Sequence, residues 1–292
     1  MRMLSSSPLL LALFSILTPL SCGPQPESPS SVLSADGTPI SYAVHGSGEP
    51  ALVFVHGWSC DRTYWDAQVP YFSGAHRVVT IDLAGHGESG IGREVWSMRA
   101  FGQDVAAVVE DLGLEEMVLV GHSMGGPVVV EAARLLGDRV KGIVGADTFN
   151  DVSVRYSSEQ LQAFVQPFRN DFSGTAGEFV RSSFFVPASD TTLIEWIVED
   201  MSSGPPVVGL GAFEGLTAWT NDESADAFRG LGVPVRLINS DYNPTNVDAG
   251  RAYTSSFDAV FMSGVGHFVM MEYPETFNSF LADIVEEFSP TP

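Results

Sequence analysis

Short apolar runs alternate with longer segments of helical periodicity from about Ser31 onward. The runs lie within 51–57, 77–90, 115–126, 139–149, 234–242 and 257–268, and most of them end in glycine-containing turns. A continuous apolar run is typical of a strand buried on both faces, and strands that alternate with helices form a parallel sheet covered by helices. We therefore expect an α/β fold with a mostly parallel central sheet flanked by helices.

The sequence also predicts a ribbon before these strands, a helix between two of them and a helix after the last one. Asp36-Gly37 lies between two alternating runs, which predicts a two-stranded ribbon at the start of the sheet. Residues 98–114 place apolar side chains on one helical stripe, and Pro274 suits the first turn of a last helix that extends to Phe288.

The strand signal disappears between Thr148 and Asp226. Helical periodicity replaces it, and an excursion of this length between two strands is far longer than an ordinary loop, so it must fold on itself. We expect a helical cap at 148–226, inserted into a core formed by 32–147 and 227–292.

The N-terminal segment is typical of an export signal. It carries an early Arg2, then an apolar run, then small residues before Cys22, which predicts a signal peptide over 1–22 and a Pro/Ser-rich tether over 23–31. The position of Cys22 resembles the lipidated cysteine of bacterial lipoproteins, which would tether the protein to a membrane. We expect an exported protein of the cell envelope or extracellular space, and a packed free thiol at Cys60.

The charge excludes one class of partner. The formal net charge is −22, from 36 acidic and 14 basic residues, and Lys141 is the single lysine. Binding to a phosphate backbone requires basic clusters, so nucleic acid is not an expected partner. The acidic surface is interpreted as solvated, and the sequence leaves the oligomeric state open.

The segment Gly121-His122-Ser123-Met124-Gly125-Gly126 follows a predicted strand and precedes a predicted helix. A serine on such a tight turn needs glycines on both sides, because a Cβ there would clash with the neighbouring backbone. Its hydroxyl is then exposed at a helix N-terminus, where backbone N–H groups favour a developing negative charge. Ser123 is the candidate nucleophile.

At these residues the chain resembles the α/β-hydrolase superfamily, in its capped, single-domain, serine esterase-like form. Ser123 matches the nucleophile elbow of that superfamily, and His56-Gly57 resembles the turn of its oxyanion hole. The resemblance implies that the backbone N–H groups of Trp58 and Met124 bind the oxyanion. It also implies the α/β-hydrolase fold for the sheet and helices described above.

His267 is the candidate general base. It lies between glycines and the last helix, and a loop residue there can project into the mouth of the sheet. Its position matches the histidine of the superfamily. The other histidines precede or lie within early loops, and a hydrogen-bonded structural role is the better interpretation for all of them: His45, His56, His76, His86 and His122.

The third member of the triad has two candidates. Aligning Pro234–Ile238 with the superfamily pattern puts Asn243, which carries no charge, at the usual acid position, whereas Asp241 lies two residues earlier. Asp147 ends the preceding strand, and that location resembles haloalkane dehalogenases, whose acid follows the same strand. Asp147 is preferred and Asp241 is the alternative. Either carboxylate would orient the imidazole and stabilise its charged form.

A serine nucleophile predicts acyl transfer through an acyl-enzyme, with neither a cofactor nor a metal. The cap is rich in Phe and Trp, which indicates an apolar pocket for a small or medium carboxylic ester. The same triad could act on a lactone, an amide or a C–C bond, or in perhydrolysis. A non-catalytic ligand-binding or sensor protein is the alternative from another class. Taken one by one, most of these aromatic side chains are interpreted as packing of the cap, and only together do they indicate a pocket. They are Phe164, Phe168, Phe172, Phe179, Phe184, Phe185, Trp196, Phe213 and Trp219, with Trp58 and Trp65 near the oxyanion turn.

Overall fold

The computed structural model describes residues 30–254 and 256–289. The predicted signal peptide, Cys22 and most of the predicted tether lie outside these residues, and export and a lipid anchor stay predictions. Within the described part of the chain, none of the helices combines the length and the apolar character needed to cross a bilayer.

An eight-stranded sheet in the order β1-β2-β4-β3-β5-β6-β7-β8 forms the centre of the molecule. The β1–β2 and β2–β4 pairs are antiparallel, and all other neighbours are parallel, which confirms the predicted mostly parallel sheet. Because β1 begins at Ser30, the last two residues of the predicted tether already belong to the sheet. The strands are β1 (Ser30–Leu33), β2 (Pro39–His45), β3 (Ala51–Val55), β4 (Val78–Ile81), β5 (Met117–His122), β6 (Val140–Ala146), β7 (Val235–Ser240) and β8 (Phe257–Met262).

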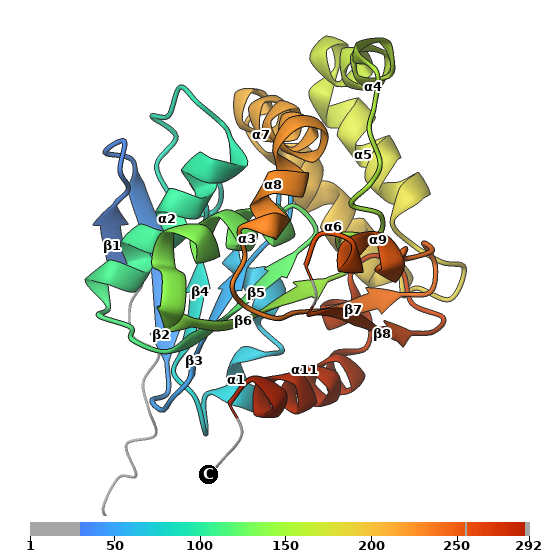
Figure 1. Cartoon of the computed structure of the whole chain (residues 1–292). Coiled ribbons are helices and arrows are strands. Elements are labelled where there is room, and N and C mark those ends of the chain that lie inside the picture. The colour runs from blue at the N-terminus through green and yellow to red at the C-terminus, as the bar shows by residue number, and fades with distance from the viewer. Residues whose placement is uncertain (1–29, 255, 290–292) are drawn as a thin grey trace, which may run out of the picture.

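Helices cover both faces of the sheet, with α2 and α3 on one face and α11 on the other (Figure 1). Ser97 caps α2 by accepting a hydrogen bond from the backbone N–H of Ala100. The helices of the core are η1 (Arg62–Trp65), α1 (Val69–Phe72), α2 (Met98–Asp111), α3 (Gly125–Leu136), η2 (Gly137–Arg139), α8 (Ser224–Arg229), α9 (Val247–Arg251), α10 (Val269–Glu272) and α11 (Pro274–Phe288).

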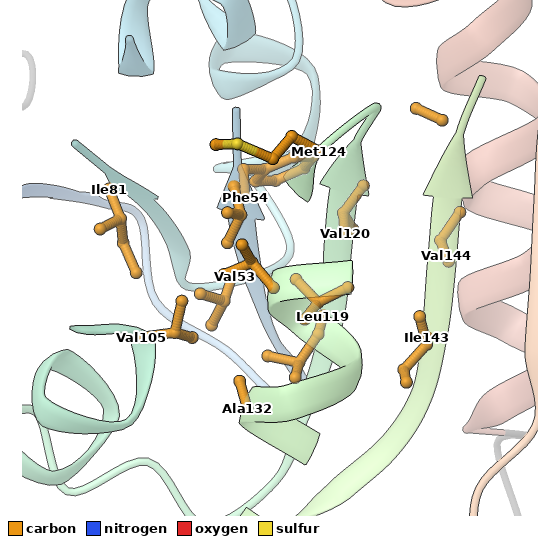
Figure 2. Close-up of a cluster of buried hydrophobic side chains, with 14 of the residues drawn as sticks. Val53, Phe54, Ile81, Val105, Leu119, Val120, Met124, Ala132, Ile143 and Val144 are labelled. Carbon is orange, nitrogen blue, oxygen red and sulfur yellow. The ribbon is translucent and has the colours of Figure 1, made fainter. Parts of the chain in front are cut away.

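The hydrophobic core lies between the sheet and these helices. Every residue of β3 and β5 is buried, as expected for central strands covered on both faces. Figure 2 shows their side chains gathered with Val105 of α2 and Ala132 of α3. Each large apolar side chain buried there contributes about 1.5–3 kcal/mol to folding. This core fixes the strand ends from which the candidate site residues project.

Four helices lie between β6 and β7, within the interval predicted to form a cap: α4 (Ser158–Asn170), α5 (Phe172–Ser183), α6 (Thr191–Ser203) and α7 (Pro206–Ala218). A short π-helix, η3 (Trp219–Glu223), joins α7 to α8. The ring of Trp58 packs edge-on against Phe168, Phe172 and Phe213, one from each of α4, α5 and α7. α8 crosses the predicted boundary at residue 226 and packs its Phe228 into the core, so the passage from cap to core is a continuous helical path.

Candidate active site

Ser123 lies on a sharp turn between β5 and α3. Its φ of +51° is in the left-handed region that non-glycine residues seldom adopt, so the turn is a strained one. A Cβ at Gly121 would lie 2.3 Å from the carbonyl oxygen of Gly125, and a Cβ at Gly125 would lie 2.5 Å from that of Val55. The two glycines therefore allow the strand, the turn and the helix to pack at backbone distance, with the hydroxyl at the helix N-terminus.

The turn that contains His56, Gly57 and Trp58 packs directly against Ser123. A Cβ added at Gly57 would lie 3.3 Å from the Cβ of Ser123. Met124 is the N-cap of α3, so its backbone N–H has no acceptor inside the helix. The backbone N–H of Trp58 likewise has no acceptor among the described residues. The two backbone N–H groups predicted to form the oxyanion hole therefore have no acceptor among the described residues.

His267 follows a glycine turn after β8 and precedes α10. Its ring Nδ1 lies 2.6 Å from Oδ2 of Asp147, and both side chains are largely buried. A proton on Nδ1 is donated to this carboxylate, which leaves Nε2 as an acceptor. His267, Asp147 and Ser123 line one cavity, so the structure brings these three predicted residues together.

Asp147 directly follows β6 and has a φ of +43°, a second left-handed residue in the site. Its Oδ1 accepts hydrogen bonds from the backbone N–H of Ser240, at 2.8 Å, and from the hydroxyl of Ser240, at 2.9 Å. The side chain of Asn239 also binds both the N–H and the carbonyl of Thr148, which pins the loop beside the carboxylate. β7 therefore holds Asp147 in place with its Oδ2 directed to the imidazole.

Asp241, the alternative acid, has a different partner. Its Oδ1 accepts a hydrogen bond from the backbone N–H of Gly264 at 3.2 Å, so it stabilises the turn before His267. Asn243 is engaged through its carbonyl, which accepts from the side chain of Asn150. Of the two candidate carboxylates, Asp147 is the one that contacts the imidazole.

The remaining histidines are mostly buried and neutral. Burial lowers the pKa of His56, whose Nε2 accepts from the N–H of Leu83. Burial and the neighbouring His56 lower the pKa of His86 to about 3. Burial and His267 lower the pKa of His122 well below its usual range, and its Nε2 donates to the carbonyl of His267. His56 is hydrogen-bonded through both ring nitrogens and His86 and His122 through one each, whereas Nε2 of His86 and Nδ1 of His122 have no partner within the described residues.

A cavity of about 690 Å³ opens beside these residues, between the core and the cap. Its walls are mostly apolar and come from the loop after β6, from α4 and α7, and from the π-helix η3. Three predicted aromatic residues line it, Phe164, Phe213 and Trp219, whereas Phe168 and Phe172 are buried in packing. Phe149 also lines the cavity and was not predicted, because it follows the acid in sequence instead of lying on a helical stripe.

Within residues 30–254 and 256–289, no group of three or more His, Cys, Asp or Glu side chains is arranged to hold a metal ion. Cys60 is buried and unpaired, with its thiol 3.3 Å from the carbonyl of Trp58. Burial raises the pKa of this thiol well above its usual range, as expected for a packed cysteine.

Comparison with known proteins identifies the family. A family model described as the alpha/beta hydrolase fold matches residues 50–274, which include the elbow, the cap and the histidine loop. This chain belongs to the alpha/beta hydrolase fold family. The match confirms the predicted resemblance to the α/β-hydrolase superfamily.

Curated alpha/beta hydrolase relatives include two proteins that are each 30% identical to this chain and cover 72% of it. One is a non-heme haloperoxidase from Rhodococcus erythropolis, and the other is a bifunctional esterase/perhydrolase from Acinetobacter calcoaceticus; 80% of each is matched. Among solved structures, a thermophilic esterase from Thermogutta terrifontis superposes with a TM-score of 0.77 at 25% identity, covering 89% of this chain and 99% of its own. The chain therefore resembles hydrolases over nearly all of its described length.

Proposed function

We propose that this alpha/beta hydrolase is a serine esterase that cleaves small or medium, apolar carboxylic esters through an acyl-enzyme. The observation that carries the proposal is the 2.6 Å hydrogen bond between His267 and Asp147 in the cavity that Ser123 also lines. A nucleophile, a base and a carboxylate that orients the base are the parts that acyl transfer requires.

In the proposed mechanism, Oγ of Ser123 attacks the ester carbonyl while Nε2 of His267 takes its proton. The tetrahedral intermediate carries a full negative charge on one oxygen. The backbone N–H groups of Trp58 and Met124 are the proposed donors to that oxygen, and losing one such donor commonly costs about 10²–10³ in rate. His267 then returns the proton to the departing alcohol. A water molecule activated by the same imidazole hydrolyses the acyl-enzyme.

Asp147 is the proposed orienting acid. Because its Oδ1 is already engaged by two hydrogen bonds from Ser240, only Oδ2 is free to accept from the imidazole. This arrangement supports the Nδ1–H tautomer of His267 that leaves Nε2 unprotonated for Ser123. A carboxylate in this position also stabilises the imidazolium that forms as the serine proton is transferred.

The cavity supports the choice of substrate. At about 690 Å³ it is within the range of small-molecule sites, and its aromatic and aliphatic walls suit an apolar acyl or alcohol group. Esters with short to medium chains are therefore the proposed substrates.

The first test is labelling of the purified protein with a fluorophosphonate probe, followed by hydrolysis of p-nitrophenyl butyrate. We expect labelling and turnover in the wild type and neither in Ser123→Ala. Thr148→Ser is a suitable control, because it changes a hydroxyl residue in the same cavity and keeps the hydroxyl that donates to the carbonyl of Ser123. Failure of the wild type to label would instead support the non-catalytic binding or sensor alternative.

Perhydrolysis is a second candidate, favoured by the names of the haloperoxidase and esterase/perhydrolase relatives. In that reaction hydrogen peroxide replaces water, so that the acyl-enzyme releases a peracid and regenerates Ser123. Peracid formation from an ethyl ester and peroxide, measured beside hydrolysis of the same ester, tests it. A Ser123-dependent peracid product supports this activity, and its absence at saturating peroxide excludes it.

A further inference from the structure

The cap contacts the candidate base directly through Phe184. This residue is the C-cap of α5, at the start of the connector to α6, and its side chain is half-buried. Its carbonyl oxygen accepts a hydrogen bond from the backbone N–H of His267 at 2.7 Å. Its ring is stacked on the imidazole of His267, with the centroids 4.4 Å apart and the planes 30° from parallel. One cap residue thus holds both the backbone and the ring of the candidate base.

This close approach depends on Gly266. A Cβ at that position would lie 2.3 Å from the carbonyl oxygen of Phe184, which is closer than any side chain allows. The glycine before the histidine therefore has a second role besides loop flexibility, because its lack of a side chain allows the cap backbone to reach the N–H of His267.

A second contact joins the same connector to the same loop. Glu272 of α10 accepts from the backbone N–H of Gly266 at 2.9 Å through Oε1, and from the hydroxyl of Ser189 at 2.6 Å through Oε2. Phe185 stacks on Phe268, with centroids 5.7 Å apart. The connector between α5 and α6 is therefore fastened to the histidine loop at both of its ends.

From these contacts we infer that Phe184 is a positioning residue for the general base, an inference that rests on the proposed function of His267. The hydrogen bond to Asp147 fixes one atom of the imidazole but leaves rotation about the line of that bond. A stacked ring fixes the plane of the imidazole, and so the direction in which Nε2 points. Catalysis is sensitive to such placement, since an error of about 1 Å in a reacting group costs about 10²-fold in rate.

The test compares three single variants on p-nitrophenyl butyrate. Phe184→Leu removes the ring and Phe184→Tyr restores a ring of the same shape. Phe280→Leu is the matched control, since it removes a half-buried ring from α11, away from the cavity and the histidine loop. We expect Phe184→Leu to lower kcat about 10- to 100-fold with KM changed less than about threefold. Phe184→Tyr should recover most of kcat, and Phe280→Leu should remain close to the wild type.

A general loss of packing gives a different result. Equal losses of kcat in Phe184→Leu and Phe280→Leu, an unchanged kcat in Phe184→Leu, or no recovery in Phe184→Tyr would each overturn the inference. If thermal melting shows that Phe184→Leu does not fold, Phe184→Met replaces it, because an unbranched side chain fills the same space without a ring. If the wild type neither labels nor turns over ester, the proposed function has failed. If the wild type labels and turns over ester through Ser123, and the Phe184 variants have the same kcat as the control variant, only the positioning role has failed.

Discussion

Asp147 and His267 are 120 positions apart in sequence, and a 2.6 Å hydrogen bond joins their side chains. The carboxylate follows β6, whereas the imidazole follows β8, so β7 lies between the two strands in the sheet. β7 bridges this gap through Ser240, which donates two hydrogen bonds to the other oxygen of Asp147. The pair is therefore supported by the sheet itself, and each strand from β6 to β8 contributes to it.

This relationship predicts different results for the two candidate acids. Asp147→Asn should lower kcat by about 10³–10⁴, because an amide can donate its N–H to the imidazole and so favour the wrong tautomer. Asp241→Asn removes the same charge from the adjacent loop but keeps an oxygen that can accept from the N–H of Gly264, so kcat should change less than about fivefold. Steady-state kinetics and thermal melting of both variants check this. A larger kcat loss in Asp241→Asn would reassign the acid.

Ser240→Ala should lower kcat by a smaller factor. The variant loses the hydroxyl bond to Asp147 but keeps the backbone N–H bond, so the carboxylate is held less firmly. A hydrogen bond of this kind contributes about 1 kcal/mol, or about fivefold in rate if it acts only on the placement of the base. Ser34→Ala is the matched control, since Ser34 is a buried serine that donates to Asp104, away from the cavity. We expect both variants to lose stability and only Ser240→Ala to lose kcat, and equal kcat values would refute the role of Ser240.

Much of the fold could be predicted from the sequence because its signals are local. The apolar runs marked the parallel strands, and Pro274 marked the first residue of α11. The passage from cap to core could not be placed as well, because α7, η3 and α8 follow one another without a break in the helical path. Only tertiary packing of Phe228 assigns α8 to the core.

The candidate site was predictable where a residue type and a turn coincide, as at Ser123 and His267. The choice between Asp147 and Asp241 was not, since both follow strands and the decision depends on which carboxylate faces the imidazole. Phe184 could be identified from the sequence only as one of the cap aromatics, and its role beside His267 could not be predicted. On a helical stripe it is one of many cap aromatics, and its contact with His267 exists only because Gly266 lets two distant backbones meet.

The buried histidines predict that acid weakens the fold. The pKa of His86 is lowered from its ordinary 6.5 to about 3 by burial and by His56, so below pH 6.5 the unfolded chain binds a proton that the folded protein does not. The contribution of His86 to the free energy of unfolding is therefore fully present above pH 6.5 and is lost progressively as the pH falls toward 3. At pH 5 the loss from this one group is about 2 kcal/mol. Nδ1 of His86 faces the carbonyl of Ala84, and a glutamine can donate to the same oxygen.

Urea unfolding at pH 7.5 and pH 5.0 tests this for the wild type and His86→Gln. The difference in unfolding free energy between the two pH values should shrink by about 2 kcal/mol in the variant, because glutamine does not titrate. All other ionisable groups are common to both proteins, so their contributions cancel in the comparison. An unchanged difference would mean that His86 is protonated in the folded protein.

The cavity wall predicts a limit on substrate length. Leu161 of α4 lines the cavity, so Leu161→Trp places a large ring in the space available to the acyl or alcohol chain. We expect kcat/KM for p-nitrophenyl octanoate to fall about tenfold or more, while the value for the acetate ester changes little. Leu193→Trp makes the same change on α6 outside the cavity and should leave the ratio of kcat/KM for the two esters unaltered.

A parallel loss of kcat/KM on both esters in Leu161→Trp would indicate a disturbed fold, and an unchanged ratio would show that long chains are bound elsewhere. In either case this wall would not set the substrate size, because only a selective loss on the longer ester requires the chain to occupy the space beside α4.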